Sequence, residues 1–165
     1  MCGIGGLISL DSTNVIPLTK TMMKSMNKRG PDGTGLFIDN RLYQYESPEK
    51  ILCNSPNTKL ALGHNRLAIV GDRQHIQPFQ SCDGKLAMEH NGEIYNYKML
   101  KEKLKKEHHF VSNTDSEIVV HLFEHYYKET GFSDLLKAIR KTVADIDGIY
   151  ALAIKDRNED KIYLV

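Results

Sequence analysis

The second residue of the chain is the first candidate for chemistry. Cys2 follows the initiator Met1 and precedes Gly3-Ile4-Gly5-Gly6. If Met1 is removed, one residue carries both a thiol and a free α-amine, and an amine of pKa about 7.7–8.0 can accept the thiol proton near neutral pH. A nucleophile paired with the amino terminus of its own chain is a known catalytic arrangement. A chance cysteine before a glycine-rich strand start is the alternative that these residues leave open.

A side-chain amide beside a glycine is the second candidate. Asn91-Gly92 follows an apolar run at 86–90 that predicts a strand, so we expect the pair where that strand ends. The amide of Asn91 and the backbone N–H of Gly92 can both donate to one oxygen, as an oxyanion hole requires. A plain Asn-Gly turn is the alternative.

Two opposite charges could form a pocket for an amino acid. Arg66 stands beside the apolar residues 67–70, and its guanidinium suits a carboxylate. Asp115 stands at a predicted helix start and could face an ammonium group. The alternatives are an Arg66 that extends from a strand edge to solvent and an Asp115 favoured only by the helix dipole.

One helix carries a metal-like spacing of histidines. His121-Leu122-Phe123-Glu124-His125 has the H-x-x-E-H pattern of inverted zinc metalloproteases, and both histidines would lie on one helix face. The interpretation we prefer is two surface histidines beside the apolar face of the helix. His108 and His109 show no partner spacing.

The elements that must position these residues come in pairs of strands and helices. Strands are predicted at 4–10, 34–38, 42–46, 60–64, 86–90, 149–154 and 161–165. Helices are predicted after Pro17 with a stripe of Leu18, Met22 and Met26, after Asn96, after Thr114 with a capping box to Glu117, and after Ser133. Strands and helices do not alternate regularly, which favours an α+β fold with mostly antiparallel sheet.

Composition limits the classes of function. The chain has 165 residues, 41% hydrophobic and 26% charged, which fits one globular domain spanning 1–165. A formal net charge of +1 argues against nucleic acid and anionic membranes as partners. Three distant cysteines argue against a disulfide framework. No apolar run approaches the ~20 residues of a membrane span, and the start has no secretory pattern, so a cytoplasmic location is expected.

Six motifs in order resemble the class II glutamine amidotransferase domain, an N-terminal-nucleophile hydrolase, over the whole chain. They are Met1-Cys2-Gly3-Ile4, 29–35 (RGPDGTG), 63–70 (GHNRLAIV), Gln77-Pro78, 91–96 (NGEIYN) and 114–117 (TDSE). Within the family, RLAIV, RGPD and NGEIYN are most similar to the glutaminase domain of asparagine synthetase, whose place is asparagine biosynthesis. The resemblance implies a four-layer αββα sandwich of two antiparallel sheets.

The resemblance also implies a role for each site residue. Cys2 would attack the side-chain amide of L-glutamine, and Asn91 with the Gly92 N–H would hold the oxyanion. Arg66 would bind the α-carboxylate, and Asp115 with Glu93 the α-ammonium. Backbone groups of Leu67, Ile69 and Val70 would line the pocket. A γ-glutamyl thioester would form, ammonia would leave, and water would release glutamate; no cofactor or metal is implied.

The end of the chain leaves further questions to the resemblance. In relatives, the stretch matching 162–165 continues into more strands and then a synthetase domain, so the last strands of the sandwich are expected to be absent here. Ammonia would pass to a synthetase domain or to a partner chain, and a homo-oligomer is left open. A glutamine-binding or assembly module without turnover is the alternative function.

Overall fold

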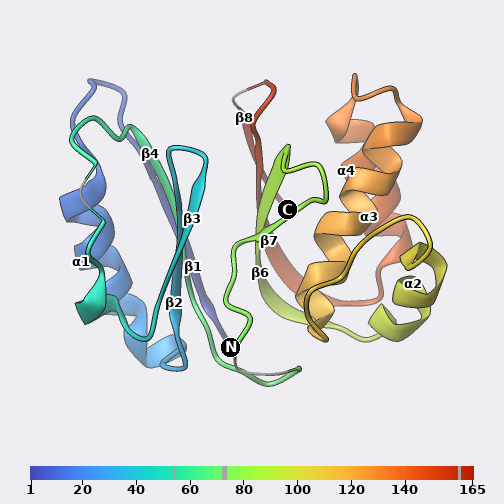
Figure 1. Cartoon of the computed structure of the whole chain (residues 1–165), viewed down its shortest axis with the longest axis horizontal. Helices are drawn as coiled ribbons and strands as arrows, with labels where there is room; N and C mark the ends of the chain where they lie inside the picture. The colour runs from blue at the N-terminus through green and yellow to red at the C-terminus, as the bar shows by residue number, and fades with distance from the viewer. Residues whose placement is uncertain (54, 72–73, 160) are drawn as a thin grey trace. The chain divides into compact units, whose positions relative to one another are not determined.

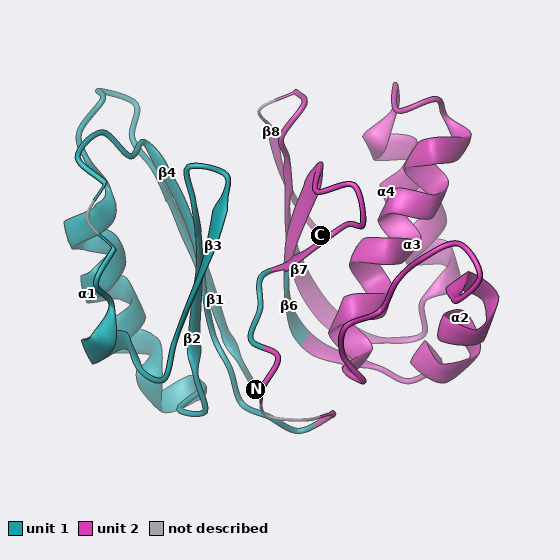
Figure 2. Cartoon of the chain, in the orientation of Figure 1, with its two compact units in different colours: residues 1–69, 76–78, 89–91 teal, residues 70–75, 79–88, 92–165 magenta. Residues whose placement is uncertain are grey.

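The computed structural model describes residues 1–53, 55–71, 74–159 and 161–165 (Figure 1). The chain divides into two compact units (Figure 2). Unit 1 comprises residues 1–69, 76–78 and 89–91, and unit 2 comprises 70–75, 79–88 and 92–165. In the described part of the chain, no helix has the length and apolar character needed to cross a membrane.

Unit 1 contains a four-stranded antiparallel sheet in the order β1-β4-β2-β3. The strands are β1 (Gly3–Ile8), β2 (Thr34–Ile38), β3 (Arg41–Tyr45) and β4 (Leu60–Asn65). The sheet pairs Gly3 of β1 with Asn65 of β4 and Asn65 with Thr34 of β2. The register therefore brings residue 2 beside the chain that leaves β4 at residue 66.

Helix α1 (Ile16–Met26) packs on β1 and β4 of this sheet, and two 3-10 turns, Asn27–Arg29 and Pro48–Lys50, complete the unit (Figure 1). The helix was predicted, but its apolar stripe was wrong. Ile16, Thr19 and Met23 are the buried residues, whereas Leu18 is exposed. Met22 and Met26 are only partly buried against the core, because Met23 occupies the centre of the helix–sheet contact.

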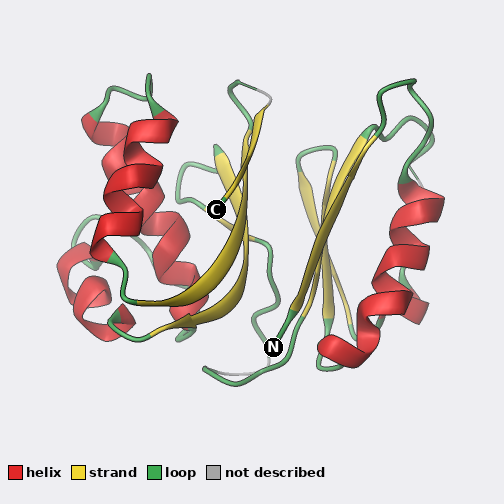
Figure 3. Cartoon of the chain, turned by 180° about the vertical axis from the view of Figure 1, so that it is seen from behind, coloured by secondary structure: helices red, strands yellow, loops and turns green. Residues whose placement is uncertain are grey.

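Unit 2 holds most of a second antiparallel sheet, in the order β5-β6-β7-β8. Its strands are β5 (Phe79–Gln80), β6 (Leu86–Ile94), β7 (Gly148–Asp156) and β8 (Lys161–Leu164). Residues 89–91 of β6 belong to unit 1. Helices α2 (Tyr97–Leu104), α3 (Asp115–Glu129) and α4 (Leu135–Asp145) cover one face of this sheet (Figure 3). Apolar residues of α3, α4 and β6 form a common core.

Two features of the helix and strand ends differ from the prediction. Strand β6 continues through Asn91 and Gly92 to Ile94 instead of ending at residue 90. Helix α4 is capped by Asp134, whose carboxylate accepts a hydrogen bond from Lys137 N, and not by Ser133. The fold class is confirmed: the chain is α+β, and each of two antiparallel sheets carries helices.

Candidate active site

Cys2 lies against the segment that follows β4. Its Sγ is 3.4 Å from the backbone nitrogen of Leu67 and 3.6 Å from the carbonyl oxygen of the same residue. A backbone N–H directed at sulfur favours the thiolate over the thiol. The side chain is half-buried, while Met1 is 69% exposed and so accessible to removal. The predicted nucleophile and one predicted pocket residue are therefore neighbours in unit 1.

Arg66 is buried, with 4% of its surface exposed, so the alternative of an arginine extending into solvent is wrong. Its backbone is held by the loop that carries the RGPDG motif. Arg66 N donates to Gly33 O at 2.8 Å, and Asp32 N donates to Arg66 O at 2.9 Å. The Asp32 carboxylate also accepts a hydrogen bond from Ala68 N at 2.9 Å. This loop fixes the path of residues 66–68.

Gly30 of that loop shows why a glycine is required. A Cβ at this position would lie 2.1 Å from the carbonyl oxygen of Asn65, which is backbone and cannot move aside. Only a residue without a side chain lets the loop approach the end of β4 so closely. The motif that carried the resemblance is thus a structural support for Arg66.

The backbone directly before Asn91 is held by two buried side chains of unit 1. His90 N donates to Gln77 Oε1 at 2.6 Å, and Gln77 Nε2 donates to His90 O at 3.1 Å. His64 Nε2 lies 3.3 Å from the same carbonyl oxygen. Burial lowers the pKa of His64 to about 3, so its imidazole is neutral and Nε2 carries the proton toward that oxygen.

Asn91 and Gly92 lie inside β6, so the alternative of an Asn-Gly turn is wrong. A Cβ at Gly92 would be 2.0 Å from the carbonyl oxygen of Ile149 in β7. Close pairing of the two strands therefore demands a glycine there. The Oδ1 of Asn91 is buried, and among the described residues it has no hydrogen-bond partner. The Gly92 residue itself is exposed.

Asp115 is the first residue of α3 and is buried in unit 2. Its Oδ2 accepts a hydrogen bond from Ile94 N at 2.9 Å, which ties the start of α3 to the end of β6. Glu93, the residue before Ile94, is exposed. The contact brings two of the residues assigned to the α-ammonium, Asp115 and Glu93, to one region of unit 2.

The predicted capping box at the start of α3 is wrong. The Thr114 side chain makes no capping hydrogen bond. The Glu117 carboxylate accepts hydrogen bonds from Val111 N and Ser112 N, both at 2.7 Å, and from the Ser112 hydroxyl at 2.6 Å. Although burial opposes its charge, these hydrogen bonds lower the pKa of Glu117. Glu117 therefore holds the loop before the helix.

The predicted site residues are divided between the units. Unit 1 carries Cys2, Arg66, Leu67, Ile69 and Asn91, and unit 2 carries Val70, Gly92, Glu93 and Asp115. Printed contacts join Cys2 with Leu67 in the first unit and Asp115 with the Glu93–Ile94 segment in the second. Arg66 is buried beside the first pair through its peptide bond to Leu67.

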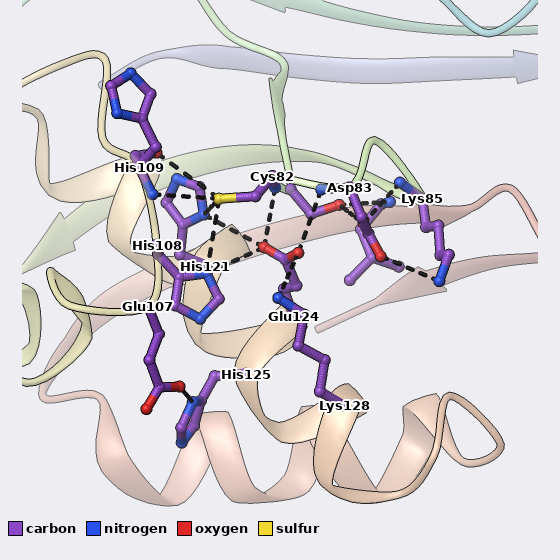
Figure 4. Close-up of polar contacts among 12 residues, drawn as sticks. Cys82, Asp83, Lys85, Glu107, His108, His109, His121, Glu124, His125 and Lys128 are labelled. Carbon is purple, nitrogen blue, oxygen red and sulfur yellow. Dashed lines mark hydrogen bonds and ion pairs between the residues drawn. The ribbon is translucent and has the colours of Figure 1, made fainter.

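The H-x-x-E-H histidines do not share one ligand set, so the pattern does not describe a protease-like site. His121 is 2% exposed, and its Nδ1 faces Cys82 and Glu124, so its expected surface position is wrong. His125 instead faces Glu107, at 3.3 Å (Figure 4). Sequence reasoning missed Cys82 and His108, which lie 39 and 13 positions before His121 and carry no spacing signal.

Titration within this histidine cluster follows its hydrogen bonds. Burial disfavours the charge of Glu124, but hydrogen bonds from His108, His121, Cys82 N and Lys128 outweigh burial and lower its pKa. Burial also opposes protonation of His121, yet Glu117 and Glu124 raise its pKa. Burial raises the pKa of the Cys82 thiol.

Known proteins resemble this chain over nearly its whole length. A putative glutamine-hydrolysing asparagine synthetase of Methanocaldococcus jannaschii is 34% identical over 166 residues, covering 99% of this chain and 28% of that protein. A glutamine–fructose-6-phosphate aminotransferase of Streptococcus agalactiae is 32% identical over 175 residues, covering 99% and 28%. The chain thus spans less than a third of the length of these relatives.

A solved structure and a family model agree with these relatives. The glutamine phosphoribosylpyrophosphate amidotransferase of Bacillus subtilis, complexed with ADP and GMP, superimposes with a TM-score of 0.72 at 24% identity. It covers 95% of this chain and 35% of that one, which supports the fold. Residues 48–165 match the family model described as a glutamine amidotransferase domain. The chain belongs to the glutamine amidotransferase family.

Proposed function

We propose that residues 1–165 together form a glutaminase domain that hydrolyses L-glutamine to glutamate and ammonia. The observation that carries this proposal is the placement of the Cys2 thiol 3.4 Å from Leu67 N, beside buried Arg66, in a chain of the glutamine amidotransferase family. A nucleophile at the second position is useful only when Met1 is removed, because the free α-amine of Cys2 is the base.

The reaction needs only groups of this chain and water. The α-amine takes the thiol proton, and the thiolate attacks the side-chain carbonyl carbon of glutamine. Asn91 and the Gly92 N–H donate to the oxygen as its negative charge develops. The α-ammonium returns the proton to the leaving nitrogen, so ammonia departs and a γ-glutamyl thioester remains. Water, deprotonated by the same amine, then cleaves the thioester and releases glutamate.

Charge explains how glutamine would be selected. Arg66 binds the α-carboxylate through its planar guanidinium, and its burial strengthens this ion pair. Asp115 and Glu93 bind the α-ammonium. Backbone groups of Leu67, Ile69 and Val70 line the pocket.

The use of the ammonia is proposed by analogy with the relatives. The motifs are most similar to asparagine synthetases, and the chain covers only part of each relative's length. We therefore propose that the ammonia passes to a synthetase domain or a partner chain in the cytoplasm, for amide synthesis such as that of asparagine. The oligomeric state, including a homo-oligomer, is to be measured by light scattering. No cofactor or metal takes part in the proposed hydrolysis.

The direct test replaces the nucleophile. Cys2→Ala should abolish glutamate release, a loss of at least about 10³-fold, because no other group can form the thioester. Glutamine binding and the circular dichroism spectrum should persist. Cys53→Ala is the matched control, since Cys53 is also a free thiol of unit 1 but lies in its core, and it should keep the activity.

Two results would contradict the proposal. One is full glutaminase activity in Cys2→Ala, and the other is an intact-mass spectrum in which active protein still carries Met1. A wild-type chain that binds glutamine without releasing glutamate would instead identify the alternative, a binding or assembly module.

A further inference from the structure

Four side chains that could bind a metal converge in unit 2, outside the proposed glutaminase site (Figure 4). Cys82 lies in the turn between β5 and β6, His108 in the segment after α2, and His121 and Glu124 on α3. One ligand atom of each residue lies within 4.8 Å of those of the other three. Cys82 is exposed and the other three are buried, so the group is accessible from one side.

The separations of the donor atoms suit a tetrahedral ion. Zinc bond lengths of about 2.0–2.3 Å at tetrahedral angles place neighbouring donor atoms about 3.3–3.6 Å apart. Cys82 Sγ is 3.5 Å from His121 Nδ1 and 3.8 Å from His108 Nδ1. Glu124 Oε2 is 3.1 Å from His108 Nδ1 and 3.6 Å from His121 Nδ1. Small shifts of these side chains would centre an ion among them.

Groups around the four donors hold them as outer ligand partners do. His109 N donates to Cys82 Sγ at 3.3 Å, which favours a thiolate. Glu117 Oε1 lies 3.6 Å from His121 Nε2, so a carboxylate faces the ring nitrogen that points away from the other donors. Glu124 Oε1 pairs with Lys128 at 3.0 Å, while Oε2 faces the two histidines.

We propose that Cys82, His108, His121 and Glu124 bind one zinc ion. A thiolate, two imidazoles and a carboxylate form the mixed set that zinc accepts, and four protein ligands make a closed, structural site. On binding, the Cys82 thiol releases its proton to solvent, and the two negative ligands balance the charge of the ion. The site would tie the β5–β6 turn and the segment after α2 to α3. This inference does not rest on the proposed glutaminase activity.

Metal binding is measured first, on the full chain carrying Cys2→Ala and Cys53→Ala. Cys82 is then the one remaining cysteine. After dialysis against a chelator, calorimetric titration with Zn²⁺ should give one ion per chain. Titration with Co²⁺ should give an intense thiolate-to-cobalt absorption band that Zn²⁺ removes. Absence of stoichiometric zinc, or cobalt bound without the thiolate band, would overturn the proposal.

Variants then assign the ligands. Cys82→Ser should abolish the thiolate band and weaken zinc binding by about 100-fold or more, and Glu117→Gln, which alters only an outer partner, by about 10- to 100-fold. His125→Gln is the control, because His125 belongs to a different group with Glu107 and His108, and it should bind zinc normally. Loss in His125→Gln with normal binding by Cys82→Ser would contradict the assignment.

A measurement without ligand variants protects the test against misfolding. Zinc should slow alkylation of Cys82 at least about 10-fold, read by peptide mass spectrometry on the same Cys2→Ala, Cys53→Ala chain. An unchanged alkylation rate at saturating zinc would show that the thiol is not a ligand, whatever the variants do.

Discussion

Glu89 of β6 is completely buried in unit 1, and neither of its carboxyl oxygens has a hydrogen-bond partner among the described residues. Burial raises the pKa of this carboxyl well above its usual range, and the nearby backbone N–H of Gly5 opposes this only weakly. The folded protein therefore holds a proton that the unfolded chain releases near pH 4.3. Glu89 favours folding below that pH and loses this contribution as the pH rises toward its folded pKa.

Glu89→Gln should remove this dependence, because an amide of the same shape does not ionise. We expect the free energy of unfolding of wild type, relative to that of Glu89→Gln, to fall by up to about 1.4 kcal/mol per pH unit above pH 4.3. Urea unfolding of both proteins at pH 5, 6 and 7 measures this difference. Parallel pH profiles would mean that Glu89 is ionised in the folded state. Glu93→Gln, an exposed substitution, controls for the loss of a carboxyl.

At the scale of elements, the pairing of β6 with β7 decides the geometry of the Asn91-Gly92 pair. The strand runs through both residues, and Ile149 O would contact any Cβ at Gly92. The peptide between Asn91 and Gly92 is therefore part of a rigid sheet, which suits a hydrogen-bond donor that must be fixed before the substrate arrives.

Gly92→Ala should destabilise the fold by about 3 kcal/mol or more, because the 2.0 Å contact with backbone forces the strands apart. Gly5→Ala is the matched control on strand β1. Its added Cβ would meet only the flexible side chains of Met22 and Met26, so we expect a change within about 1 kcal/mol. Urea unfolding measures both. Equal stabilities of the two variants would contradict close pairing at Gly92.

For the whole molecule, the proposed substrate has two charged ends, and the residues assigned to them come from different units. Arg66 belongs to unit 1, and Asp115 belongs to unit 2. Glutamine that binds only the folded chain must stabilise it by linkage. The size of that effect reports whether both charges take part.

In the Cys2→Ala background, glutamine at ten times its Kd should raise the free energy of unfolding by about 1.4 kcal/mol. Arg66→Gln and Asp115→Asn should each remove most of this increase at the same concentration, since each leaves one charged end of glutamine unpaired. Thermal unfolding with and without glutamine measures it. Arg140→Gln, an exposed substitution on α4, should retain the full increase. Retention by Arg66→Gln or Asp115→Asn would contradict the assigned contacts.

Much of the fold was predictable because it is written in local patterns. Alternating and continuous apolar runs predicted most of the strands, and the helical period of 118–126 predicted α3. Helix and strand ends were less predictable. Glu117 has the spacing of a capping box but binds Val111 and Ser112, because a loop folds back on the helix start. The partner of a polar side chain depends on segments that a local window does not contain.

The sequence by itself determined the family, the place of Cys2 at the chain start and the motifs around Arg66, Asn91 and Asp115, because residue types at short, ordered spacings are visible in one dimension. Only the tertiary structure decided that Asn91-Gly92 lies within a strand, that Arg66 is buried, and that Cys82 and His108 meet His121 and Glu124. The physical reason is that burial and donor distances arise from packing between segments far apart in the chain, and local propensity carries no record of that packing.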